Sequence, residues 1–180
     1  MLGNDIVDLK LATTQSNWRR KGYLDKLFSS QEQQEILNSS NPETMVWLFW
    51  SMKEAAYKIV NRETKERFYS PKKFNVTSYG NDGIVTFEGK TFYTKSEIKD
   101  NLIHTIAAAK AENLNHIQSS FLANADDYLS DFNSKSEHYT LEKDANGIPS
   151  IVDKTNGKSH FASVSHHGRY LSVVSDITTQ

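Results

Sequence analysis

The sequence predicts an α+β fold in which one long helix packs on a small antiparallel sheet. Three observations predict it. A helical apolar repeat begins near residue 42, several short alternating segments separated by turn residues follow it, and 37% of the 180 residues are apolar. A chain of this length can bury a sizeable core, and no internal repeat divides it. We therefore expect one domain over residues 1–180.

The first element is a short strand in the segment GNDIVDL. Strand alternation puts Asp5 on one face with Val7 and places Asn4, Ile6 and Asp8 on the other. A carboxylate that shares an apolar face must be paired, hydrogen-bonded or bound to a metal. Asp5 is therefore either a metal ligand or an ordinary aspartate of a turn or cap near the start of the chain.

Two helix starts follow. Ser29 and Glu32 have the spacing of a capping box and predict a short helix. Asn41 as cap, Pro42 as first helical residue and Glu43 in the first turn predict the long helix, which we expect to end near residue 61.

The long helix contains the segment WSMKEAAYK, in which Glu54 and Lys58 are neighbours one turn apart. Such a pair on a solvated face contributes only about 0.3–0.5 kcal/mol. Trp50 and Tyr57 flank Glu54, however, and indicate a partly buried site. Mg²⁺ commonly takes one or two carboxylates plus phosphate oxygens. Asp5 and Glu54 would supply the carboxylates, and Lys58 would offset phosphate charge.

The rest of the chain reads as strands. Residues 103–110 fit either a strand or a helix, and the end of the chain resembles two strands joined at His166–Gly168. Ser165, His166 and Arg169 around this turn suit a phosphate-binding loop. An exposed hairpin without a ligand explains the same residues.

Composition excludes several classes of protein. The net charge of −1 gives no overall attraction to nucleic acid or to anionic membranes. The absence of cysteine excludes disulfides, thiolate catalysis and Cys-based zinc sites. No apolar run has the length of a membrane span, and the first residues lack the pattern of a signal peptide. We expect a cytoplasmic protein.

Four segments, in this order, resemble the 4′-phosphopantetheinyl transferase superfamily. GNDIVDL is similar to the family's G-x-D-I-V-E-I opening, and WSMKEAAYK to its W-x-x-K-E-x-x-x-K helix. GIPSIV resembles its G-K-P-x-[LI] stretch, and ASVSHHGRYLSVV its S-[LI]-[ST]-H segment. The joint occurrence of the four motifs in this order is more specific than any one of them.

The resemblance implies a 4′-phosphopantetheinyl transferase-like fold and a Mg²⁺-dependent enzyme. Such an enzyme transfers the 4′-phosphopantetheine group of coenzyme A to a serine of an apo acyl or peptidyl carrier protein, for example in fatty acid or polyketide biosynthesis. It implies metal binding by Asp5 and Glu54 and catalytic roles for Glu54 and Lys58. Coenzyme A binding would fall to the residues that match the family's motifs, together with their neighbour Arg169: Lys53, Lys58, Ser165, His166 and Arg169.

The motif order resembles the compact holo-acyl-carrier-protein synthases. In that type the subunits associate, so the resemblance implies a homotrimer in which His166 faces Asp5 and Glu54 of a neighbouring subunit. The chain is longer than the compact type needs, which predicts an insertion around residues 78–137. Phe49, where the compact type usually has arginine, departs from the pattern.

Two other functions remain open at this point. The same carboxylates would serve another Mg²⁺-dependent enzyme, such as a nucleotide pyrophosphohydrolase. A non-catalytic coenzyme A-binding module is the second alternative.

Overall fold

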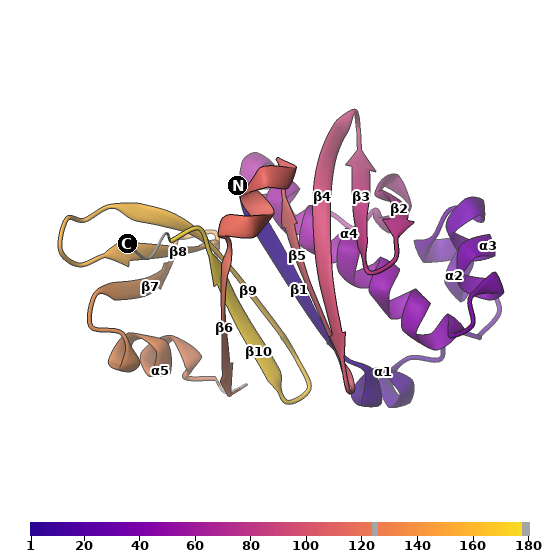
Figure 1. Ribbon diagram of the computed structural model, residues 1–180, viewed down its shortest axis with the longest axis horizontal. Helices are drawn as coiled ribbons and strands as arrows, with labels where there is room; N and C mark the ends of the chain where they lie inside the picture. The colour runs from indigo at the N-terminus through magenta and orange to yellow at the C-terminus, as the bar shows by residue number, and fades with distance from the viewer. Residues whose placement is uncertain (124–125, 178–180) are drawn as a thin grey trace.

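The computed structural model describes residues 1–123 and 126–177, which form a mixed α/β structure with two antiparallel five-stranded sheets and several helices (Figure 1). The N-terminal sheet and the long helix α4 (Pro42–Thr64) pack against each other as two layers. The second sheet, built from the C-terminal part of the chain, lies against strand β1 of the first.

The first sheet has the strand order β1-β5-β4-β3-β2. Helix α4 crosses the face formed by β1 and β5, and its apolar side chains make up much of the larger hydrophobic core. The strands are β1 (Leu2–Asp8), β2 (Asn75–Tyr79), β3 (Asp82–Phe87), β4 (Lys90–Lys99) and β5 (Leu102–Ala108).

The predicted helix caps are confirmed. The hydroxyl of Ser29 accepts from the backbone of Glu32, whose carboxylate accepts from the Ser29 N–H. Asn41 caps α4 through the N–H of Thr44, and Pro42 is the first helical residue. The other helices are α1 (Leu9–Gln15), α2 (Tyr23–Leu27), α3 (Ser30–Asn38), α5 (Tyr128–Lys135) and the 3₁₀ turns η1 (Pro71–Lys73) and η2 (Ala111–His116).

The second sheet has the strand order β6-β10-β9-β8-β7 and its own small core. Helix α5 packs on one face of this sheet, and β1 packs on the other. Among the described helices, none is both long and apolar enough to cross a membrane. The strands are β6 (Gln118–Ala123), β7 (Tyr139–Lys143), β8 (Pro149–Asp153), β9 (Ser159–His167) and β10 (Tyr170–Ser175).

The sequence predicted the fold class and the long helix but only one small sheet. The structure has two sheets, and the ambiguous segment at residues 103–110 forms most of β5, the strand that pairs with β1. The local pattern of the later strands predicted that they exist. It contained no information on which of them share a sheet, because pairing depends on contacts far apart in sequence.

Candidate functional site

Strand β1 holds the candidate site because its two faces contact different parts of the molecule. Its odd-numbered residues face α4, and the contact is very close: a Cβ atom on Gly3 would lie 2.1 Å from the carbonyl oxygen of Ala55. Only glycine permits this approach. The approach brings the backbone of the strand next to the helix one turn before Lys58 and places Asp5 near Glu54 and Lys58.

Lys58 links the strand, the helix and the second sheet. Its ammonium donates to the carbonyl of Asn4 at 2.6 Å and to the carbonyl of Val164 at 3.3 Å. It also lies 3.8 Å from the carboxylate of Asp5, and the Lys58 side chain is 28% exposed. Burial lowers the pKa of Lys58, whereas the nearby charges of Asp5 and Glu54 raise it.

The carboxylates of Asp5 and Glu54 share one electrostatic environment. Burial raises the pKa of Asp5, opposed by Lys58 and by hydrogen bonding that includes the Ser51 hydroxyl. Burial, with the negative charge of Asp5 as the next cause, raises the pKa of Glu54 to about 7, and Lys58 partly offsets this. A pKa that is shifted by burial together with a neighbouring charge is common at functional sites.

This donor set fits a hard divalent cation. Mg²⁺ is typically held by one or two carboxylates and completes its shell with water and phosphate oxygens. The negative charge of Asp5 contributes to the raised pKa of Glu54. A cation bound between the two carboxylates would relieve this repulsion. Across the described ranges 1–123 and 126–177, no group of three or more His, Cys, Asp or Glu side chains forms a complete protein cage. The arrangement therefore suits a metal shared with a ligand.

The Ser-His segment of β9 lies beside the other face of β1. The hydroxyl of Ser165 accepts from the side-chain amide of Asn4 at 2.8 Å, and the hydroxyl of Ser163 accepts from the Asn4 N–H at 3.2 Å. The amide of Asn4 also donates to the carbonyl of Ser172 on β10 at 3.3 Å. Ser165 is 4% exposed, so its hydroxyl mainly holds the second sheet against β1.

His167 lies at the end of this interface. Its Nδ1 accepts from the backbone N–H of Asp8 at 2.9 Å, and its Nε2 lies 3.0 Å from the side-chain oxygen of Gln15. These partners assign the neutral tautomer with the proton on Nε2. Because side chains alternate along a strand, His166 extends from the opposite side of β9 and is exposed.

The structure does not bring all predicted residues together. Asp5, Glu54 and Lys58 form one cluster, whereas Arg169 is 64% exposed, donates to the Tyr170 hydroxyl and lies 3.9 Å from Asp8.

Lys53 has a different environment. Its ammonium is buried and donates to the Glu32 carboxylate at 2.7 Å and to the carbonyls of Leu27 and Pro71. These partners do not support Lys53 as a ligand of coenzyme A.

Sequence reasoning missed Asn4 and His167. Asn4 is fully buried and is the main polar link between β1 and the second sheet. The sequence signal for Asn4 was a polar residue within a short, largely apolar strand, directly before Asp5. His167 gave no signal that distinguished it from His166.

Two comparisons with known proteins bear on this site. A family model described as the 4′-phosphopantetheinyl transferase superfamily matches residues 1–110, which include β1, α4 and the cluster of Asp5, Glu54 and Lys58. No curated protein matches the chain.

Proposed function

Because this chain belongs to the 4′-phosphopantetheinyl transferase superfamily, we propose that it transfers the 4′-phosphopantetheine group of coenzyme A to a serine of an apo carrier protein. The observation that supports this most directly is the cluster of Asp5, Glu54 and Lys58, which β1 and α4 bring together from positions about fifty residues apart. The proposed subtype is the holo-acyl-carrier-protein synthase, acting on acyl or peptidyl carriers.

The proposed reaction is a displacement at phosphorus. The serine oxygen of the carrier forms a bond to the phosphorus that bears pantetheine, and the bond from this phosphorus to the bridging oxygen breaks. Adenosine 3′,5′-bisphosphate leaves with that electron pair. Such a transfer depends on positioning and on charge stabilisation more than on covalent help from the protein.

The residues of the cluster have distinct proposed roles. Asp5 and Glu54 would hold Mg²⁺, which when bound supplies positive charge beside the pyrophosphate. The ammonium of Lys58, held by two carbonyls, would bind a pyrophosphate oxygen. Glu54 would also accept the proton of the serine hydroxyl as the general base.

The hairpin at residues 166–169 is the proposed contact for the outer part of coenzyme A. His166 and Arg169 are exposed, and a cation and an imidazole at a turn can approach a phosphate. The Ser165 hydroxyl is already bonded to Asn4, and the Lys53 ammonium to Glu32. Both residues would therefore position other groups of the site rather than contact coenzyme A directly.

A single chain contains both parts of the proposed site. The resemblance implied a homotrimer with the Ser-His segment supplied by a neighbouring subunit. Here β9 of the same chain contacts β1 through Ser163, Ser165 and His167. We therefore propose that residues 1–180 act as one transferase domain and that each chain has its own site. The predicted insertion at residues 78–137 remains a prediction.

The test is incubation with coenzyme A, Mg²⁺ and a panel of apo acyl and peptidyl carriers, read by intact mass. We expect one phosphopantetheine mass on at least one carrier. Glu54→Gln and chelation of the metal should each lower kcat/KM by about 10²-fold or more. Cleavage of coenzyme A without a modified carrier would instead favour a nucleotide pyrophosphohydrolase. The absence of coenzyme A binding by calorimetry would contradict both enzymatic functions.

A further inference from the structure

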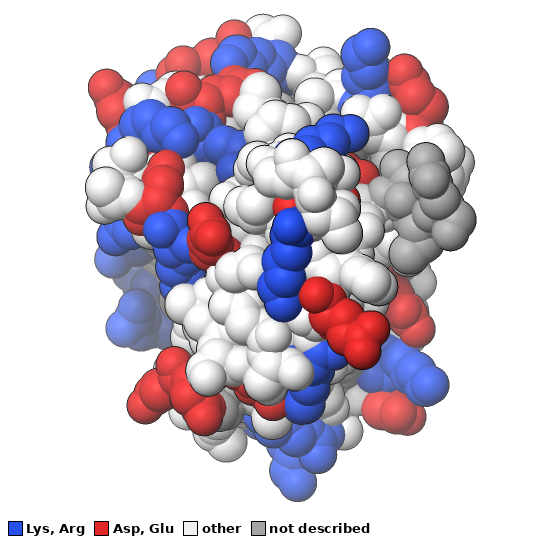
Figure 2. Space-filling model, turned by 90° about the vertical axis from the view of Figure 1, so that its left-hand side faces the viewer, with Lys and Arg blue, Asp and Glu red and all other residues white. Residues whose placement is uncertain are grey.

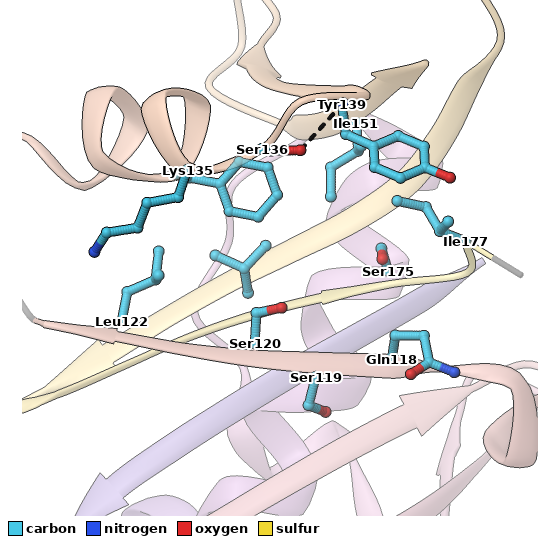
Figure 3. A pocket seen from close by; sticks show the side chains of 12 residues that line it. Gln118, Ser119, Ser120, Leu122, Lys135, Ser136, Tyr139, Ile151, Ser175 and Ile177 are labelled. Atoms are coloured by element: carbon cyan, nitrogen blue, oxygen red, sulfur yellow. Dashed lines mark hydrogen bonds between the residues drawn. The ribbon is translucent and has the colours of Figure 1, made fainter. Parts of the chain in front are cut away.

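A cavity of about 400 Å³ lies between helix α5 and the second sheet, on the face away from β1 (Figure 3). We infer that this cavity binds a neutral, largely apolar small molecule that carries one hydrogen-bonding group. Its volume lies within the roughly 300–1,000 Å³ typical of ligand sites. It is lined by side chains from four strands and one helix: Gln118, Ser119, Ser120, Leu122, Phe132, Lys135, Ser136, Tyr139, Ile151, Val173, Ser175 and Ile177.

The walls of the cavity are mostly apolar. Ile151, Val173 and Ile177 are buried and belong to the small core of the second sheet, while Leu122 and Phe132 pack against that core and remain partly buried. Apolar side chains that contact a cavity lose the dispersion contacts that a filled core would provide. An apolar ligand would supply them.

The charge around the cavity indicates a neutral ligand. Lys135 is the charged residue among the lining side chains, and its ammonium pairs with Asp131 at 2.7 Å and is 67% exposed. Figure 3 shows its side chain extending away from Ser175 and Tyr139. On the face of the molecule in Figure 2, acidic and basic side chains are mixed, and neither sign forms a broad patch.

Ser175 adds a polar group to the mostly apolar wall of the cavity. Its side chain lines the cavity, yet the residue is only 6% exposed. The buried side-chain atoms without a hydrogen-bond partner among the described residues are Asn4 Oδ1 and Asp176 Oδ1, so the Ser175 hydroxyl is not one of them and lines the open space of the cavity. A ligand with one donor or acceptor would form a hydrogen bond with this hydroxyl, which typically contributes about 0.5–1.5 kcal/mol. By contrast, the Ser136 hydroxyl is already bonded to the Tyr139 N–H at 3.1 Å.

The cavity and the transferase site lie on opposite faces of the same sheet. On β10, the Ser172 hydroxyl bonds to His104 at 2.9 Å, and the Ser172 carbonyl accepts from Asn4 on β1. Val173 and Ser175 line the cavity on the other side. None of Asp5, Glu54 and Lys58 lines the cavity, so the inference does not depend on the proposed function.

The probe for the test is N-phenyl-1-naphthylamine, which is neutral and apolar, has one N–H donor and fluoresces strongly in apolar surroundings. We expect saturable binding to the full chain that coenzyme A does not displace. Ser175→Ala should weaken it about two- to tenfold, the loss of one hydrogen bond. Ser120→Phe, which places a ring in the cavity from an exposed strand position, should weaken it at least tenfold.

Ser159→Phe is the matched control, because Ser159 is an exposed strand serine of the same sheet outside the cavity. It should bind the probe as the unmodified protein does. Chemical-shift changes on probe addition should concentrate at the methyl groups of Leu122, Val173 and Ile177. Unsaturable binding, or equal binding by the Ser120→Phe and Ser159→Phe proteins, would overturn the inference.

Discussion

At the scale of single residues, the two lysines of the WSMKEAAYK helix differ in what surrounds them. Lys58 is partly exposed and donates to backbone carbonyls of two strands beside Asp5, whereas Lys53 is buried against Glu32. Helical spacing predicted that Glu54 and Lys58 are neighbours. It could not show that the partner of Lys53 is a glutamate from another helix, because that contact depends on how α3 packs on α4.

Removal of the Lys53 ammonium should destabilise the protein strongly. Lys53→Met leaves the Glu32 carboxylate buried without its cation, which typically costs about 3–5 kcal/mol. Lys135→Met removes an exposed pair with Asp131 and should cost less than about 1 kcal/mol. Urea unfolding of both variants measures the difference. Similar small losses for both would contradict the assignment of Lys53 as a structural residue.

The raised pKa of Glu54 has a consequence for stability. Its pKa is about 7 in the folded protein against 4.5 as the ordinary value, so the folded state keeps a proton that the unfolded chain releases. The stability from this proton is complete below pH 4.5 and is lost as pH rises through about 7. In chelator, the Glu54→Gln protein should therefore gain stability relative to wild type between pH 5 and pH 8. Urea unfolding across this range measures the gain; a constant difference would contradict it.

At the scale of elements, the close contact of β1 and α4 sets the geometry of the candidate site. The sequence predicted both elements, because their signals are local: alternation in β1, and the cap at Asn41 and Pro42 for α4. It did not predict that they approach so closely. The sequence shows Gly3 two positions before Asp5. The atom that requires a glycine there is the carbonyl oxygen of Ala55, more than fifty residues away, and no local pattern predicts that contact.

Gly3→Ala should separate these two elements. A Cβ 2.1 Å from a carbonyl oxygen forces β1 away from α4, so we expect a loss of about 1–3 kcal/mol and a large loss of transferase activity. Gly157→Ala is the matched control: its φ of 72° strains alanine, but no other atom lies within 4 Å of the added Cβ. It should lose stability and keep activity. Equal activity in the two variants would show that the contact does not position the site.

At the scale of the whole molecule, contacts within one chain join its first strand to strands near its C-terminal end. The resemblance to the compact synthases had implied that these segments meet across a boundary between subunits. Figure 1 shows β1, at the start of the colour scale, beside β9 and β10 near its end. The contacts between them join residues about 160 positions apart, such as Asn4 and Ser165. Sequence patterns do not predict such long-range pairings, because they depend on contacts between residues far apart in the chain.

If each chain contains its own site, activity should not depend on association. The specific activity should remain constant when the protein is diluted from micromolar to nanomolar concentration, with sedimentation measurements reporting the oligomeric state over the same range. A fall in specific activity that follows dissociation would show that a second chain contributes to catalysis.

The link from Lys58 to Val164 has a consequence for how the protein is made. One carbonyl that holds the ammonium follows Lys58 by 106 positions, on a strand that the ribosome synthesises late. A nascent chain that has completed the long helix therefore contains Asp5, Glu54 and Lys58 but lacks one of the two carbonyls that accept from the Lys58 ammonium. Because synthesis runs from the N-terminus, the contact between Lys58 and Val164 forms only after strand β9 has been made and has folded onto β1.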